Sequence, residues 1–198
     1  SGPIVVANNG ANGGLGAAGE TGKGSCVACH APPWFIDTRS QPREVSLGLA
    51  YYPANTPTNV DVVFHKWLHW NGLFEAVWSQ VLAAAYIPPT VDSNPFRIAR
   101  VIRDHYRADY EKAFGAFPTS LTSSTAPGDG PKPPLVDETL ANWNVPGTTA
   151  PQRDDAMKVW VNFGKAIEAY LRKLVSGKSD FDSYVAEAST AGGSTKIS

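Results

Sequence analysis

The chain has few of the side chains that hold metals and cofactors: its 198 residues include two cysteines, one methionine and four histidines. A zinc site would need two ligands beyond the cysteines, and no second C-x-x-C or histidine pair at a matching spacing is present. There is no block of basic residues and the net charge is −1, so neither nucleic acid nor an anionic membrane surface is an expected partner. No apolar run approaches the length of a membrane span, and we expect no membrane insertion.

Both cysteines lie in one short motif, Cys26-Val27-Ala28-Cys29-His30. C-x-x-C-H is the attachment signature of a c-type haem, because two thiols three positions apart can add to the two vinyl groups of one porphyrin. The histidine that follows brings an imidazole to the iron as proximal ligand. The alternative, a disulfide or a redox C-x-x-C, expects a βαβ context and gives no reason for the histidine. We therefore predict one covalently bound haem c.

The predicted location of the protein follows from this cofactor. The chain opens with SGPIVV and has neither the basic start nor the apolar core of a signal peptide. Covalent haem is normally attached outside the cytoplasmic membrane, so we infer that a signal peptide has been removed. We expect a periplasmic or extracellular protein.

Composition divides the chain into three parts. Residues 1–24 are small and glycine-rich and are predicted to be a flexible arm, residues 25–186 a c-type haem domain, and residues 187–198 a disordered tail. The 16 prolines and 18 glycines imply long ordered loops. No internal repeat and no convincing strand run is present, so the expected fold class is all-α, a cytochrome c-like haem domain with long loops.

Periodicity and end signals locate the helices. The clearest pattern precedes Gly115, where apolar and aromatic side chains recur in steps of four. The last helix has acidic residues in its first turn, basic residues in its last turn, and Gly177 after it. The predicted helices are a short one that presents the cysteines, then 73–86, 95–114 and 151–176. The predicted loops are an extended loop at 31–60 and a long surface loop at 119–149.

Four segments carry a resemblance to a known family. They are CVACH with the following Trp34-Phe35-Ile36-Asp37, the N-T-P-T of residues 55–58, the H-W-N-G of residues 69–72 followed by Gln80, and residues 163–184. Together they span roughly residues 24–186, and this stretch resembles the N-terminal haem domain of bacterial di-haem cytochrome c peroxidases. That family includes the methylamine-utilisation di-haem enzyme, which oxidises a tryptophan on another protein.

The resemblance implies roles for several residues around the haem. His69 precedes Trp70, at a place that faces the distal side of the haem in the family, and it is the candidate distal group. His65, four positions earlier, is the less favoured candidate; if residues 64–70 were helical, both imidazoles would share one face. Gln80 matches the distal-pocket glutamine, and Trp70 matches the tryptophan that relays electrons between two haems. The structural alternatives are a hydrogen-bonded histidine, a solvated glutamine and a core tryptophan.

Three further residues have weaker assignments. Asn55 matches an asparagine that helps to hold a calcium ion between the domains of relatives, so calcium is a second candidate cofactor. Met157 is the only methionine available for His/Met ligation of the iron. It fits the apolar stripe of the last helix, and packing is the favoured interpretation. His105 sits on an amphipathic helix and is interpreted as structural.

The chain also departs from the family pattern. Family members carry a second C-x-x-C-H in a second domain, and this sequence ends where that domain would begin. The chain would then be a fragment, a subunit whose partner carries the second haem, or a one-haem descendant. The distal glutamate of the family corresponds to a position near Thr90, with Asp92 as the closest acid, and the arginine of the family's W-D-G-R motif is Leu73.

These observations support a principal hypothesis and two alternatives. The first is a peroxidase-like haem oxidoreductase, the peroxidatic half of a di-haem enzyme, that reacts with hydrogen peroxide or O2 and exchanges electrons with a second haem. Its partners would be a second haem domain or subunit and a small redox donor protein. The first alternative is a mono-haem electron-transfer cytochrome without catalysis of its own. The absent distal glutamate also allows an oxygenase-like reaction.

Overall fold

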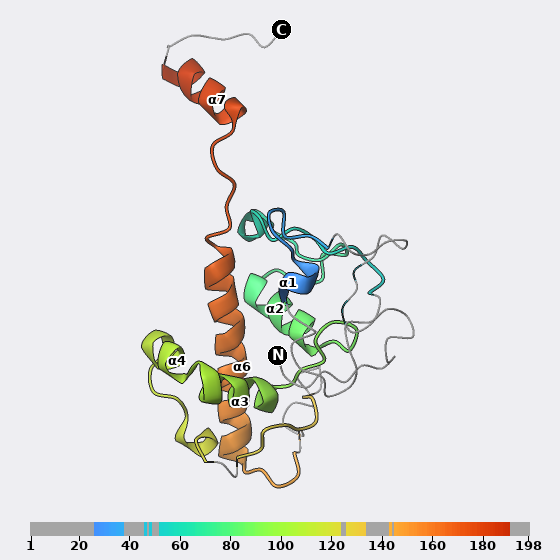
Figure 1. The fold of residues 1–198 in the computed structure, drawn as a ribbon, viewed down its shortest axis with the longest axis vertical. Coiled ribbons are helices and arrows are strands. Elements are labelled where there is room, and N and C mark those ends of the chain that lie inside the picture. Colours follow the sequence, from blue (N-terminus) through green and yellow to red (C-terminus); the bar gives the residue numbers. More distant parts are fainter. Residues whose placement is uncertain are drawn as a thin grey trace.

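Helix α6 (Ala150–Leu171) is the longest element of the computed structural model, and α2 and α3 pack along its sides (Figure 1). The structure describes residues 26–37, 46, 48, 52–123, 126–133, 143 and 145–190. The predicted arm of residues 1–24 and residues 191–198 of the predicted tail lie outside the described residues. The short elements are α1 (Cys26–Cys29) and the 3-10 turns η1 (Val62–Phe64) and η2 (Thr119–Leu121). Over the described residues the only β features are two isolated bridges, so the predicted all-α class is confirmed.

Helix α6 begins at a capping box and ends several residues before its predicted end. Thr149 Oγ1 accepts a hydrogen bond from Gln152 N–H at 3.4 Å, and Gln152 Oε1 accepts one from Thr149 N–H at 2.9 Å. Beyond the helix, the Leu174 carbonyl accepts a hydrogen bond from Asp61 N–H at 2.8 Å. Ser176 N–H donates to the Asp61 carboxylate, also at 2.8 Å. The N–H of Ser176, which the predicted helix would have paired internally with the Arg172 carbonyl, is therefore bonded to a distant turn instead.

Helix α2 (Val77–Tyr86) approaches α6 closely. A Cβ atom at Gly164 of α6 would lie 2.7 Å from the carbonyl oxygen of Trp78, so only glycine allows this separation. The helix begins four residues later than predicted. The preceding segment forms a bridge instead, in which Leu68 N–H donates to the Phe74 carbonyl at 2.8 Å.

Two helices stand where one continuous helix was predicted, and that prediction is wrong. Helix α3 (Pro95–His105) is separated from α4 (Arg107–Phe114) by Tyr106, whose φ of −132° and ψ of 18° are not helical. The bend brings Tyr110 into the core, where its ring lies 5.3 Å from that of Phe117. Packing of this side chain therefore overrides the local periodicity.

The main core lies between α3, α4 and α6. The stretch 119–149, predicted to be a surface loop, supplies three of its buried side chains: Leu121, Trp143 and Val145. The indole N–H of Trp143 donates to the Pro131 carbonyl at 3.0 Å, which satisfies its one polar atom inside the protein. Because these three side chains are buried, the prediction of a surface loop is wrong for these residues.

A second, smaller core lies beside the first and joins α2, α6 and the turn before the histidines. Its buried members are Val62, Leu68, Val77 and Leu171. The side chains anchor η1 and the following loop against the end of α6. The small core therefore holds in place the segment that carries His65 and His69.

Helix α7 (Asp180–Thr190) follows an extended segment and lies beyond the end of α6 (Figure 1). Ser179 caps it: Asp182 N–H donates to Ser179 Oγ at 3.2 Å, and the Asp182 carboxylate accepts from Ser179 N–H at 2.8 Å. The helix includes residues 187–190, the first part of the predicted disordered tail. None of the described helices is long and apolar enough to cross a bilayer.

Candidate functional site

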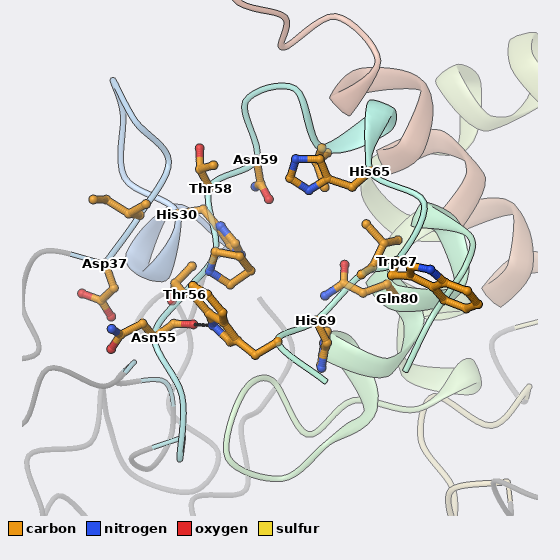
Figure 2. Close-up of a pocket in the computed structure, with 15 residues that line it drawn as sticks. His30, Asp37, Asn55, Thr56, Thr58, Asn59, His65, Trp67, His69 and Gln80 are labelled. Carbon is orange, nitrogen blue, oxygen red and sulfur yellow. Dashed lines mark hydrogen bonds between the residues drawn. The ribbon is translucent and has the colours of Figure 1, made fainter. Parts of the chain in front are cut away.

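A pocket of about 680 Å³ opens between the loop that follows α1, the stretch from Asn55 to Trp70, and the first turn of α2 (Figure 2). This volume lies in the range of sites that enclose small molecules and cofactors. The apolar and aromatic part of the lining consists of Ile36, Pro57, Val62, Trp67, Leu68 and Trp70. The other nine lining residues are polar, among them His30, His65, His69 and Gln80.

His30 enters the pocket directly after α1. Its backbone N–H donates to the Cys26 carbonyl at 2.8 Å, so the histidine continues the turn that carries the cysteines. Its Nδ1 donates to the Phe35 carbonyl at 3.0 Å. A neutral imidazole with its proton on Nδ1 keeps an electron pair on Nε2, which is the atom that binds a metal in such an arrangement.

The surroundings of His30 favour this neutral form. Burial lowers the pKa of His30, and the carbonyl of Phe35, the carboxylate of Asp37 and the carbonyl of Pro57 oppose that effect in part. The loop that supplies the Phe35 carbonyl is closed by a bridge in which Ala31 N–H donates to the Ile36 carbonyl at 3.1 Å. The residues directly after C-x-x-C-H thus orient the imidazole.

Cys26 and Cys29 occupy the two ends of α1 and are not joined by a disulfide. Residues three apart on a helix lie on the same face. Over the described residues no group of three His, Cys, Asp or Glu side chains could hold a metal ion. The predicted helix that presents the cysteines is confirmed for residues 26–29.

Hydrogen bonds join three loops around the pocket. Thr58 Oγ1 donates to the Trp34 carbonyl at 2.6 Å and accepts from Val60 N–H at 3.1 Å. The indole N–H of Trp70 donates to the Asn55 carbonyl at 2.8 Å, a bond drawn as the dashed line in Figure 2. Asn55 itself lines the pocket. The segment predicted to be an extended loop is therefore an ordered wall, in the part that the structure describes.

His65 and His69 both line the pocket, on the side away from His30 (Figure 2). Residues 64–70 are not a helix, because the only helical element there is the 3-10 turn Val62–Phe64. The two imidazoles therefore do not share one helical face. His69 instead has a positive φ of 66°, and its ring meets the edge of Phe74 at 5.2 Å. Burial lowers the pKa of His69, which favours a neutral imidazole.

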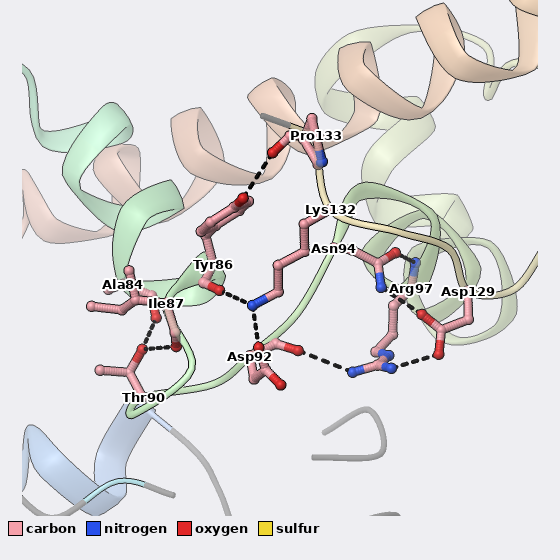
Figure 3. A network of polar contacts seen from close by, with 10 residues as sticks. All are labelled: Ala84, Tyr86, Ile87, Thr90, Asp92, Asn94, Arg97, Asp129, Lys132 and Pro133. Atoms are coloured by element: carbon pink, nitrogen blue, oxygen red, sulfur yellow. Dashed lines mark hydrogen bonds and ion pairs between the residues drawn. The ribbon is translucent and has the colours of Figure 1, made fainter. Parts of the chain in front are cut away.

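Gln80 reaches into the pocket from α2, across from His30 (Figure 2). The two residues at the position of the family's distal glutamate, in contrast, do not line it. The Thr90 hydroxyl donates to the carbonyls of Ala84 and Ile87, and Asp92 pairs with Lys132 (Figure 3). Both side chains hold the chain together after α2.

Among the described residues that line the pocket, Asp37 is the one acidic side chain. The sequence contains it in the motif after the cysteines, but its position within the pocket depends on how the loop 31–37 turns back. Its negative charge acts on His30 and partly opposes the lowering of the pKa of that imidazole by burial. Asp37 is therefore a candidate residue of the haem site that was not among the site residues predicted from the sequence.

Two other candidates lie away from the pocket. Met157 packs against the main core, beside Ala156 and Val159, which agrees with the favoured interpretation from the sequence. His105 is exposed at the end of α3 and lies edge-on to Tyr106, at 6.5 Å between ring centroids. Neither side chain is among those that line the pocket.

The residues of the pocket fit a covalent haem. Two thiols lie one turn apart on α1, and the Nδ1 of the following imidazole is already hydrogen-bonded to the Phe35 carbonyl. A pocket with apolar and aromatic side chains in its wall opens in front of that imidazole. A haem needs these three features: attachment points, an axial nitrogen and walls that exclude water. The donor set suits iron in a porphyrin better than a zinc ion held by protein ligands alone.

Comparison with known proteins agrees with this chemistry. The family model described as di-haem cytochrome c peroxidase matches residues 17–190. Comparisons with curated proteins and with solved structures give no match. The family match covers most of the chain and includes every pocket residue discussed above. The chain is therefore a haem protein of the peroxidase-like oxidoreductases and belongs to the di-haem cytochrome c peroxidase family.

Proposed function

We propose that this chain is the peroxidatic half of a di-haem oxidoreductase, with one haem c attached to Cys26 and Cys29. The observation that carries the proposal is the arrangement of His30 and Gln80 on opposite sides of one pocket with aromatic side chains in its wall. When bound, the haem supplies an iron centre that exchanges electrons and reacts with hydrogen peroxide or O2. The protein supplies attachment, orientation, exclusion of water and proton transfer.

On the proximal side, His30 would give Nε2 to the iron. The bond from its Nδ1–H to the Phe35 carbonyl holds the ring in one orientation and strengthens the basicity of the other nitrogen. Thr58 stabilises the loop that contains Phe35, because its hydroxyl donates to the carbonyl of Trp34, the residue before Phe35. An imidazole held in this way gives up less freedom when it binds the metal.

On the distal side, His69 is the first candidate and His65 the second. Burial lowers the pKa of His69, so at neutral pH its imidazole can accept a proton from a bound oxidant. The Gln80 amide can donate a hydrogen bond at the same place. These two groups would replace the distal carboxylate of relatives in proton transfer and hydrogen bonding. Asp92, the closest acid in the sequence, cannot do so because it is paired with Lys132.

Trp70 is proposed as the electron relay to a second haem. Its indole is 71% exposed and fixed by its bond to the Asn55 carbonyl, so the ring is presented at the surface beside the pocket. Trp67, which lines the pocket, and Phe64 and Leu73, which do not, are exposed near it in the sequence. Soluble monomers rarely leave such a group of large apolar side chains open to water. A second haem domain or subunit is the proposed cover, and a small redox donor protein the proposed electron source.

Two alternatives have support of their own. A pair of imidazoles, His65 and His69, lines the pocket away from His30, and either one could fill the sixth position of the iron. A protein with both axial positions filled would be an electron-transfer cytochrome. The aromatic walls and the absent distal glutamate favour an oxygenase-like reaction with O2. Calcium at Asn55 and a periplasmic or extracellular location remain part of the proposal.

The optical spectrum of the ferric holoprotein distinguishes these functions. We expect a high-spin fraction, and a change of the spectrum when hydrogen peroxide is added, together with turnover of a reduced donor. A wholly low-spin spectrum that responds to neither peroxide nor carbon monoxide in the reduced protein would indicate an electron carrier. Oxygen uptake with an organic substrate, without peroxide, would indicate the oxygenase-like reaction.

A further inference from the structure

Helix α2, which carries Gln80, has no cap of its own. The N-cap residue Ala76 has no side chain that could accept a hydrogen bond, and the first turn contains no acidic residue. The first N–H groups of a helix have no partner within the helix, and a negative charge near them is favourable. The start of α2 therefore needs an acceptor from another element.

Glu168 of α6 supplies this acceptor. Its Oε2 accepts a hydrogen bond from the backbone N–H of Trp78 at 3.1 Å, across 90 positions of sequence. Its other oxygen, Oε1, accepts from Nε and Nη2 of Arg172 at 3.1 and 2.5 Å. The Glu168 side chain is only 16% exposed, so water competes weakly for the carboxylate.

Gly164, one turn before Glu168, makes this contact feasible. A Cβ atom at this position would lie 2.7 Å from the Trp78 carbonyl and 3.0 Å from the side chain of Leu82. The N–H of Trp78 is thus bonded to the carboxylate of Glu168, and its carbonyl lies close to the backbone of α6 at Gly164. The first turn of α2 cannot slide along α6 without loss of one of these contacts.

We propose that Glu168 is a positioning residue for Gln80. Gln80 follows Trp78 by two residues in the same helical turn, and its N–H donates to the Ala76 carbonyl at 3.2 Å. A displacement of the Trp78 backbone would move the Gln80 amide within the pocket. The proposal rests on the proposed function, in which Gln80 faces a ligand on the haem.

The test compares two substitutions of equal length in the haem-loaded protein. Glu168→Gln keeps an oxygen for the Trp78 N–H, whereas Glu168→Met removes it. Cyanide titration of the ferric haem gives the dissociation constant, because the Gln80 amide can donate to bound cyanide. We expect Glu168→Met to weaken cyanide binding about five-fold, the effect of one hydrogen bond, and Glu168→Gln to stay within about two-fold.

Gln80→Ala, alone and combined with Glu168→Met, shows whether Glu168 affects cyanide binding through Gln80. Gln80→Ala should weaken cyanide binding about five-fold, and Glu168→Met should add nothing to it, because the two residues act through one contact. Asp155→Asn is the control, since Asp155 lies on the same helix but accepts from Ser120 Oγ at 2.6 Å, away from α2. It should leave the dissociation constant unchanged.

The outcomes separate this inference from the proposed function. If Gln80→Ala weakens binding and Glu168→Met does not, or if the two effects add, Glu168 does not position Gln80. If Gln80→Ala has no effect, the distal assignment of Gln80 fails, and the inference fails with it. Hydrogen exchange at the Trp78 amide is a second measurement that needs no Glu168→Met protein. Slow exchange in both the wild type and Glu168→Gln supports the inference, because both keep an acceptor oxygen for this N–H, and fast exchange in either protein overturns it.

Discussion

The indole N–H of Trp70 donates a hydrogen bond to the backbone carbonyl of Asn55 at 2.8 Å, although most of the Trp70 ring is exposed. An exposed side chain usually samples several rotamers, and this bond restricts the ring to one of them. It also joins the loop that carries His69 to the segment that faces His30. The Trp70 side chain therefore connects the wall of the pocket that contains His69 with the wall that contains Asn55.

The first prediction concerns the cofactor. The denatured chain from exported protein should have the mass of the polypeptide plus one haem, because thioether bonds to Cys26 and Cys29 survive acid and organic extraction. A Cys26→Ser, Cys29→Ser variant should lose the haem under the same extraction. Wild-type protein, exported in a host that attaches haem c, with an unmodified mass would contradict the assignment.

The second prediction concerns the distal side of the haem. His69→Ala should change the high-spin fraction of the ferric protein, and His65→Ala should change it less. Met157→Ala should leave the spectrum unchanged and lower the free energy of unfolding by about 2 kcal/mol, because this side chain packs against the main core. Spectra and urea unfolding of the three variants provide the measurements. A Met157→Ala protein with an altered spectrum, beside an unaltered His69→Ala protein, would reverse the assignment.

The third prediction concerns pH. Burial lowers the pKa of His69 below its ordinary value of 6.5, so the unfolded state binds the proton more readily than the folded state. The contribution of this residue to stability is then present above about pH 6.5 and is lost as the pH falls through the folded pKa. The free energy of unfolding, measured by urea between pH 8 and pH 5, should fall less steeply in His69→Gln than in the wild type. Equal slopes would show that His69 does not contribute.

The fourth prediction concerns the apolar surface around Trp70. Leu73 is 65% exposed, so a glutamate there should leave the fold intact, but it should prevent docking of a second haem domain because a charge would be buried. Gel filtration and native purification with the candidate partner provide the measurement. Tyr106→Glu, on the exposed bend between α3 and α4, is the matched control and should still bind. A Leu73→Glu protein that binds as well as the control would exclude this surface as the interface.

The fifth prediction concerns the contact of α2 with α6. Gly164→Ala should lower the free energy of unfolding by about 1–3 kcal/mol, because the added methyl group meets the Trp78 carbonyl. Alanine would otherwise favour a helix by about 1 kcal/mol. Gly177→Ala is the control, since nothing lies within 4 Å of a Cβ atom there, and its unfolding midpoint should match that of the wild type. A neutral Gly164→Ala variant would mean that the two helices can move apart at little cost.

The fold could be predicted from sequence where the signals are local. The absence of strand patterns indicated an all-α protein, and the predicted start of the last helix, residue 151, lies one position from the observed start at Ala150. The bend that divides the predicted helix 95–114 into α3 and α4 could not be predicted from local signals. Its periodicity continues through Tyr106, and the bend there depends on how Tyr110 packs against residues beyond the helix.

The sequence by itself determined the chemistry of the predicted haem attachment, because two thiols and an imidazole within five positions need only one turn of backbone to come together. The tertiary structure decided which distant groups face them. His65, His69 and Gln80 come to one pocket through the packing of a non-helical loop and of α2, and Glu168 reaches Trp78 across 90 positions. Such contacts depend on the summed packing of several elements, and no short stretch of sequence contains that sum.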